Sequence, residues 1–280
     1  MSFAIRRRIL PGFPLTIGLT LFYVSLIVLL PLLGLIFKAM TLSPAEFLHT
    51  VTAPRALATY RVTLLCALAA TIFNAGFGLL LAWVLARYDF PGRRLLDSIV
   101  DLPFALPTAV AGLALTGIFA TNGWIGSLLV PYDIKIAHAL PGIMIAMAFT
   151  SVPFVVRTVQ PIIQDLEPEL EEAGRSLGAS DGVIFRGVIF PTIFPSFLAG
   201  CALAFARSLG EFGAIIFIAG NRPYETEITA LLIFIRLEEY EYGQAAAIAV
   251  VVLLAAFLML LLTNAIQAWH LRYADRQDNS

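Results

Sequence analysis

Charged residues, cysteine and histidine are scarce in this sequence, and each shortage excludes a class of protein. Of the 280 residues 13% are charged, whereas a soluble domain carries about 25%. The 2 cysteines, Cys66 and Cys201, lie inside apolar runs, which favours small core residues over a disulfide. The 3 histidines have no metal-ligand spacing, and a net charge of −1 provides no basic field for nucleic acid.

The sequence also has no long polar stretch that would form a soluble catalytic domain. It contains no G-x-x-x-x-G-K-[ST] loop for a nucleotide phosphate. We therefore expect no catalytic, cofactor-binding or metal-ligating residue in this chain. If it takes part in ATP-driven transport, another chain must bind the ATP.

Apolar residues are abundant, at 59% of the chain, and they gather in six long runs. A membrane-spanning helix needs about 20 such residues. The runs cover residues 15–37, 62–86, 98–121, 139–160, 192–219 and 245–268. We expect an all-α polytopic membrane protein with six transmembrane helices, forming one domain over residues 1–280. The first run is longer than the roughly 7–15 residues of a signal peptide's apolar core, so it is interpreted as a retained span.

Lysine and arginine between the runs favour an orientation with both termini in the cytoplasm. With that orientation the inner set is the larger one: Arg6, Arg7, Arg8, Arg87, Arg93, Arg94, Arg157, Arg175, Arg186, Arg272 and Arg276. The outer set is Lys38, Arg55, Arg61, Lys135, Arg222 and Arg236. The longest inner segment then lies between the fourth and fifth runs.

Prolines interrupt the third run. Pro103 and Pro107 should break or kink its helix near the cytoplasmic end. Broken backbone within a membrane is tolerated where protein or a cavity satisfies the freed groups. The break therefore indicates either a lined pathway or a packing kink.

The inner segment between the fourth and fifth runs contains "EEAGRSLGASDGVIFRGVIFP", residues 171–191. Pro168 suits the first position of a helix, and the acidic residues after it suit the positive end of the helix dipole. Gly178 offers a left-handed helix end, and Ser180 or Asp181 can cap a second short helix that ends before Pro191. The pattern predicts two short helices joined by a glycine turn.

An acidic first helix with small residues at 173 and 174 suits insertion into a groove of a partner protein. The alternative is an amphipathic loop resting on lipid, which would normally carry lysine and arginine on its polar face. Leu166, Leu170, Ala173 and Leu177 recur at helical spacing and form the apolar strip of this segment.

The segment resembles the cytoplasmic signature of ABC importer permeases, E-A-A-x3-G-x9-I-x-L-P. The matching positions are Glu172, Ala173, Gly174, Gly178, Val188, Phe190 and Pro191. Residues 174, 188 and 190 depart from the signature but remain small or apolar. The resemblance implies the type I ABC importer permease fold and a coupling segment at about 161–191 that docks on an ATPase, with Glu172 in a polar contact and Gly178 in the turn.

The resemblance covers most of the chain. Within the ABC importer permeases, the sequence is similar to the sulfate/thiosulfate permeases of the T-type. This similarity rests on "DLPFALPTAVAGL" (101–113), "AMAFTSVPFVVRTVQP" (146–161), "RSLGEFGAIIFIAGN" (207–221) and "RYDFPGRRLLD" (87–97). Permeases for molybdate or tungstate are the alternative. The resemblance implies a bacterial inner membrane and alternating access. It also implies a second homologous permease in a heterodimer, two ATPase subunits that bind ATP and Mg, and an extracytoplasmic sulfate/thiosulfate-binding protein.

Arg207 and Glu211 lie four residues apart inside the fifth run, where we expect them on one helical face. Charges at that depth are costly and indicate function. Either Arg207 faces an anion pathway and Glu211 holds it, or the two form a packing ion pair. Other candidates for the pathway are Thr108, Thr150, Ser151, Ser208 and Asn221, each of which could instead bond helix to helix.

Two other classes remain as alternatives. A secondary anion transporter would need coupling carboxylates within the spans and usually an internal repeat, but Glu211 is the one clear carboxylate and no repeat is visible. A membrane enzyme would need clustered histidine, aspartate or cysteine near one interface, and the sequence contains no such cluster.

Overall fold

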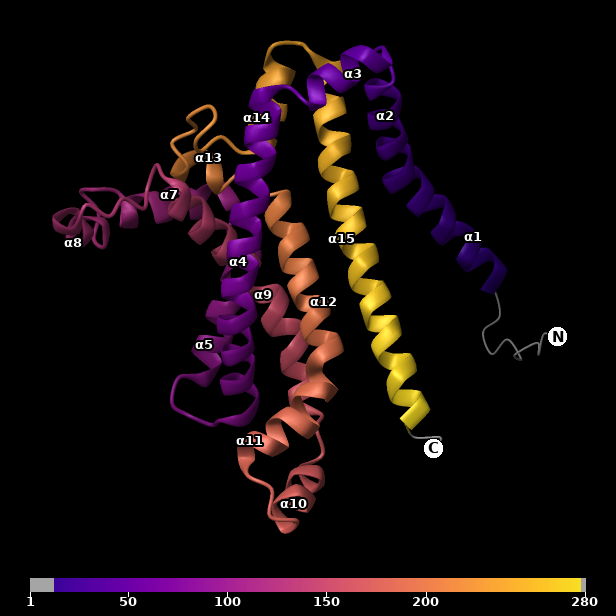
Figure 1. Cartoon of the computed structure of the whole chain (residues 1–280), viewed down its shortest axis with the longest axis vertical. Coiled ribbons are helices and arrows are strands. Elements are labelled where there is room, and N and C mark those ends of the chain that lie inside the picture. The colour runs from indigo at the N-terminus through magenta and orange to yellow at the C-terminus, as the bar shows by residue number, and fades with distance from the viewer. Residues whose placement is uncertain (1–12, 278–280) are drawn as a thin grey trace.

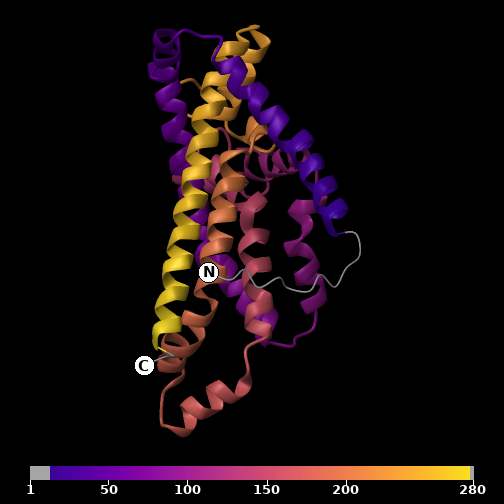
Figure 2. The same ribbon diagram turned by 90° about the vertical axis from the view of Figure 1, so that its right-hand side faces the viewer.

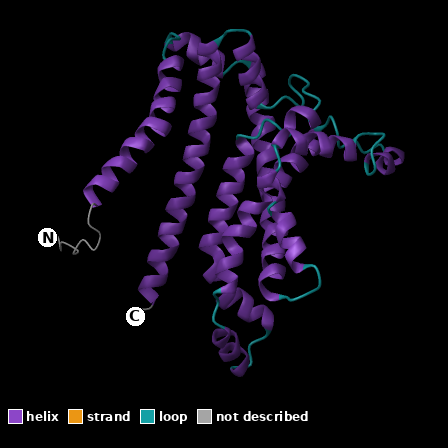
Figure 3. Ribbon diagram, turned by 180° about the vertical axis from the view of Figure 1, so that it is seen from behind, coloured by secondary structure: helices purple, strands orange, loops and turns teal. Residues whose placement is uncertain are grey.

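The computed structural model describes the backbone of residues 13–277 and the side chains of residues 15–266. Within this part every regular element is a helix (Figure 3). Arg6, Arg7 and Arg8, and the side chains of Arg272 and Arg276, on which the predicted orientation partly depends, lie outside the described residues. The all-α class predicted from the sequence is confirmed.

Three long helices form the centre of the molecule. They are α4 (Pro54–Arg87), α9 (Leu140–Gln164) and α12 (Phe190–Leu209). Their shared core at one end contains Leu85, Val155, Val159 and Ile193, all 0% exposed. Small residues let these helices approach closely: a Cβ on Gly78 would lie 3.0 Å from the side chain of Val155. Close contact between small residues is the usual means of packing helices in a membrane.

The helices give the molecule two distinct ends. At one end lie α3 (Pro44–Val51) and α14 (Thr229–Glu238), and at the other lie α10 (Pro168–Ser176) and α11 (Asp181–Ile184) (Figure 1). α4 and α15 (Tyr242–Gln277) run between these ends, and α15 finishes towards the end that carries α10. We call this end the coupling end. The loops after α4 and α9 lie at this end too (Figure 1).

Five helices in the described part are long and apolar enough to cross a membrane: Leu15–Ala39, Pro54–Arg87, Leu140–Gln164, Asp181–Leu209 and Tyr242–Ile266. The predicted third span, 98–121, is not one of them. It is divided into α5 (Arg93–Val100), α6 (Leu102–Ala105) and α7 (Thr108–Phe119). Leu106 is extended, with φ −85° and ψ 135°, because the ring of Pro107 disfavours a helical residue before it. The predicted break is therefore confirmed. It divides the run into helices that are each too short to cross a membrane alone.

The run 192–219 is also not one helix. α12 ends at Leu209, a turn follows at Gly210, and a short α13 (Ile215–Ile218) is separate from it. Between α7 and α9 the chain forms α8 (Gly126–Leu129) and the 3-10 turn η2 (Val130–Tyr132), which project sideways (Figure 1). The prediction of a single fifth helix over 192–219 is wrong.

The first span consists of α1 (Phe13–Val24), the π-helical turn η1 (Ser25–Leu29) and α2 (Leu30–Ala39). It leans away from the bundle, and none of its apolar window is buried in this chain (Figure 2). Ser43 then caps α3: its Oγ accepts the N–H of Glu46 at 3.3 Å, and the N–H of Ser43 donates in return to Glu46 Oε2 at 2.9 Å. This second bond, followed by one from the Ser43 hydroxyl, holds the pKa of Glu46 below its usual value.

Candidate coupling and transport sites

The coupling segment begins with α10 and its glycine turn. Pro168 lies in the first turn of α10, as predicted, and Gly178 has a φ of +78°. The N–H of Gly178 donates to the carbonyl of Arg175 at 2.9 Å, and that of Ala179 donates to Gly174 at 3.1 Å. These two bonds make a Schellman motif, which needs a left-handed residue at position 178. A side chain with a branched Cβ would be strained there.

The sequence predicted a separate short helix after this turn, ending before Pro191, but the structure has none. α11, the π-helical turn η3 (Phe185–Ile189) and α12 follow one another without a break. Ser180 is the residue before α11, but its side chain makes no capping hydrogen bond. The helix therefore continues through Pro191 as one stretch from Asp181 to Leu209.

The two arms of the segment touch at Gly174 and Ile184. A Cβ on Gly174 would lie 3.0 Å from Ile184 Cγ1, and Ile184 is buried. This close approach explains why a residue smaller than the alanine of the family signature fits at position 174. Val188 and Phe190 are half-buried, and the ring of Phe190 lies 5.7–6.1 Å from those of Phe185, Phe194 and Phe197.

The outer surface of the segment is exposed. Glu172 and Ala173 are exposed, and Leu177 and Val183 are 89% and 60% exposed, respectively. The apolar strip predicted from the sequence therefore faces outward at Ala173 and Leu177. An apolar surface of this kind at the end of a bundle is typical of a contact with another protein.

An ion pair that the sequence analysis missed attaches the segment to the bundle. Arg87 Nη2, at the end of α4, donates to Glu171 Oε1 at 2.5 Å, and the Arg87 guanidinium lies 5.4 Å from the Trp83 ring. Glu171, not Glu172, is thus the acidic residue that packs inward. A sequence pattern could not reveal this, because residues 87 and 171 are far apart in the chain.

The Arg207–Glu211 pair exists, but not on one helical face. α12 ends at Leu209, so Glu211 lies in the turn beyond it. Arg207 Nη2 is 2.7 Å from Glu211 Oε2, and Glu211 Oε1 accepts the N–H of Ala214 at 2.9 Å. The carboxylate of Glu211 is 1% exposed, whereas the side chain of Arg207 is 33% exposed. One acidic side chain therefore holds Arg207 and starts the next short helix.

Thr108 lies beside this turn. A Cβ on Gly213 would approach Thr108 Oγ1 to 2.2 Å, and one on Gly112 would approach the carbonyl oxygen of Ala214 to 2.3 Å. The start of α7 is therefore packed directly on the turn that follows α12. The break in the third run and the break in the fifth run meet at this point.

Ser208 points away from Arg207 into the helix bundle. Its Oγ lies 3.2 Å from Ser151 Oγ of α9, and Asn74 Nδ2 of α4 donates to the same Ser151 oxygen at 2.8 Å. All three residues are fully buried. They form a polar cluster that joins the three central helices, so Ser208 is a helix–helix contact in this structure. Asn74 was missed because a lone asparagine in an apolar run gives no pattern.

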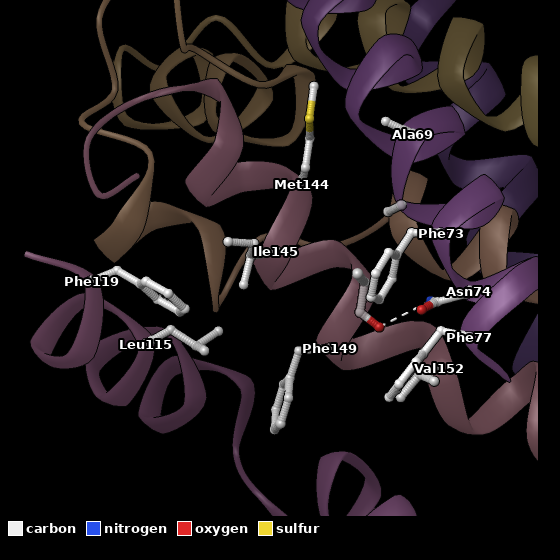
Figure 4. A pocket seen from close by; sticks show the side chains of 12 residues that line it. Ala69, Phe73, Asn74, Phe77, Leu115, Phe119, Met144, Ile145, Phe149 and Val152 are labelled. Carbon is white, nitrogen blue, oxygen red and sulfur yellow. Dashed lines mark hydrogen bonds between the residues drawn. The ribbon is translucent and has the colours of Figure 1, made fainter. Parts of the chain in front are cut away.

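An apolar cavity of about 530 Å³ adjoins this cluster, between α4, α7 and α9. Figure 4 shows Phe73, Phe77, Phe119 and Phe149 around it. Asn74 Nδ2 also donates to the carbonyl of Ala148 at 3.0 Å, and Asn74 Oδ1 is buried without a partner. The lining offers no charged group for an anion.

The side chain of Asp101, the residue before α6, makes no capping hydrogen bond. It accepts two hydrogen bonds from Arg157, from Nε and Nη2, both at 2.7 Å. Arg157 Nη1 also donates to Asp97 at 2.7 Å and to Gln160 Oε1 at 2.8 Å. This network fixes α5 against α9 near the coupling end, and the sequence alone did not predict it.

Helices of membrane length joined by buried polar contacts, with an exposed apolar segment at one end, are typical of a subunit of a membrane complex. The chain belongs to the family described as "Binding-protein-dependent transport system inner membrane component", which matches residues 74–273. It is an inner-membrane, multi-pass protein, as the sequence predicted.

Similar proteins extend this relationship over nearly the whole chain. The sequence is 54% identical over 262 residues to the "Sulfate transport system permease protein CysT" of Salmonella typhimurium, covering 94% of this chain and 95% of the relative. It is 53% identical to the protein of that name from Escherichia coli, with the same coverage. The fold matches a chain of a bacterial alginate ABC transporter with a TM-score of 0.75, at 17% identity, covering 91% and 94% of the two chains.

Proposed function

We propose that this chain is the permease subunit through which an ATP-driven importer moves sulfate, and with it thiosulfate, into the cell. The observation that supports this cargo is the 54% identity to a sulfate permease over 94% of the chain. Membership of the binding-protein-dependent family supports the class of importer. Molybdate or tungstate is the competing cargo, and the uptake experiment below separates them.

The complex that we propose contains a second homologous permease, two ATPase subunits that bind ATP and Mg, and an extracytoplasmic binding protein. The exposed Leu177, the exposed Glu172 and the fixed turn at Gly178 supply a surface for an ATPase. Because α11 continues into α12, closure of the ATPases would move α12 and the turn at Glu211 together. Alternating access would follow from that movement, with ATP hydrolysed by the partner chains.

Arg207 is the residue that we assign to the anion pathway or its gate. Only its Nη2 is paired, to Glu211, and its other N–H groups donate to no described residue. A guanidinium held at one edge and one-third exposed can still receive an oxyanion. Glu211 and Thr108 would position this turn, and Ser208 would keep α12 in register with α9.

The test is uptake of labelled sulfate by cells that lack only this chain. We expect uptake to disappear on deletion and to return with the intact gene. In the parent strain thiosulfate should compete and molybdate should not. Loss of molybdate uptake with unchanged sulfate uptake would assign the other cargo, and uptake that depends on an ion gradient without an ATPase would refute the importer class.

A further inference from the structure

We propose that a polar cavity at the coupling end, separate from the transport path, binds a tetrahedral oxyanion. The cavity has a volume of about 530 Å³ and lies between the loop that joins α4 to α5 and the last turns of α9. It is lined by Asp89, Phe90, Gly92, Arg93, Arg94, Asp97, Gln160 and Gln164.

The two acidic residues that line the cavity and the amide oxygen of Gln160 each contact an arginine. Arg93 forms an ion pair with Asp89, and Arg157 donates to Asp97 at 2.7 Å. The amide oxygen of Gln160 accepts from Arg157 at 2.8 Å. Each carboxylate that lines the cavity thus has a cationic partner, so these side chains leave little to attract a cation.

Donors, by contrast, remain free. Gln160 is 7% exposed, and because its Oε1 is held by Arg157, its Nε2 is directed to the other side of the amide, where it donates to no described residue. Gln160 lines the cavity, so this amide group is available to donate to a ligand there. The exposed side chain of Arg94 likewise has no partner in the described part of the chain.

The first turn of α5 adds two backbone donors. Gly92 precedes the helix with a φ of +89° and provides no side-chain cap. The N–H of Arg93 and that of Leu96 are bonded to Phe90 and Gly92, whereas no described acceptor receives those of Arg94 and Leu95. Free N–H groups at a helix start favour an anion.

An amide, a guanidinium and a helix start together fit the oxygens of a phosphate or sulfate group. This group can come from a phospholipid headgroup at the membrane surface or from an inorganic anion in solution. Either source would tie α5 to α9 through the loop that begins after Arg87. Because Arg87 also holds Glu171, occupation of the cavity would stiffen the attachment of the coupling segment.

The experiment measures binding to the purified complete transporter with two probes. Retention of phosphatidylglycerol is read by native mass spectrometry, and binding of radiolabelled inorganic phosphate is read by equilibrium dialysis. Retained lipid identifies a headgroup as the source, and bound phosphate identifies a free anion. Transport is not measured, so the result is independent of the proposed cargo.

Two variants and one control locate the site. Gln160→Glu keeps an oxygen for Arg157 but presents a negative oxygen to the cavity, and Arg94→Ala removes an exposed cation. Each should weaken binding about tenfold, since a hydrogen bond to a charged group is worth about one decade in affinity. Arg186→Ala removes the same charge from an exposed position that lies outside this cavity, and it should bind as the wild type does. The proposal is overturned if neither probe binds, if Gln160→Glu binds normally, or if Arg186→Ala loses as much as Arg94→Ala.

Discussion

At the scale of single residues, Glu211 stands out because its carboxylate is buried inside the helix bundle. A carboxylate that is 1% exposed is stable when it is paired and hydrogen-bonded, and Arg207 and the N–H of Ala214 supply both contacts. Removing Arg207 would cost about 3–5 kcal/mol, because Glu211 would be left as a buried charge. A single substitution therefore mixes loss of stability with loss of any anion contact.

A pair of variants separates these two effects. Arg207→Gln leaves Glu211 unpaired, so we expect less protein in the membrane and less uptake of labelled sulfate. Arg207→Gln combined with Glu211→Gln removes both charges, so the protein level should recover while uptake per inserted molecule stays at least about tenfold low, the effect of one lost charge-assisted contact. The measurement is uptake divided by the immunoblot signal from membranes. Full uptake by the double variant would show that the pair serves packing alone.

At the scale of the element, the coupling segment is the part that we propose transmits movement of the ATPases to the helix bundle. Gly178→Val places a β-branched residue at a φ of +78°, where L-residues other than glycine lose about 1–2 kcal/mol. The Schellman turn should open, and binding-protein-stimulated ATP hydrolysis by the reconstituted complex should fall to its basal rate with the chain still inserted.

The matched control is Gly182→Val. Gly182 lies in α11 of the same exposed segment, with a helical backbone and no atom within 4 Å of an added Cβ. This variant should retain most of the stimulated hydrolysis. Equal rates in Gly178→Val and the wild type would refute the coupling role of the turn.

Local chemistry explains which elements the sequence could predict. Pro107 and Gly178 impose their conformations on their immediate neighbours, so the break in the third run and the turn after α10 were foreseeable. The turn after α12 was not, because the buried carboxylate of Glu211 accepts the N–H of Ala214 there, and a sequence pattern does not show such a contact. The contacts of Arg157 with Asp97 and Asp101 join residues that the sequence leaves far apart, so their pairing needed the fold.

At the scale of the whole molecule, the chain leaves large surfaces uncovered. None of the apolar window of Leu15–Ala39 is buried within the chain, and α4 has 34 residues, or about 51 Å at 1.5 Å per residue. A hydrocarbon core is about 30 Å thick, so α4 extends well beyond it. Lipid and the partner subunits that we propose would cover the apolar helix surfaces that this chain leaves exposed.

The orientation of the molecule in the membrane is the last prediction. Leu177 at the coupling end is 89% exposed and Leu48 in α3 at the opposite end is 60% exposed, so a cysteine at either position would be accessible from one side. With the coupling end in the cytoplasm, a membrane-impermeant maleimide should label Leu48→Cys and spare Leu177→Cys in intact spheroplasts. Inverted vesicles should give the reverse. The wild type is the control, because Cys66 is buried and Cys201 is half-buried within the bundle, so both should react poorly. Labelling of Leu177→Cys in intact spheroplasts would place the coupling end outside and would remove its access to a cytoplasmic ATPase.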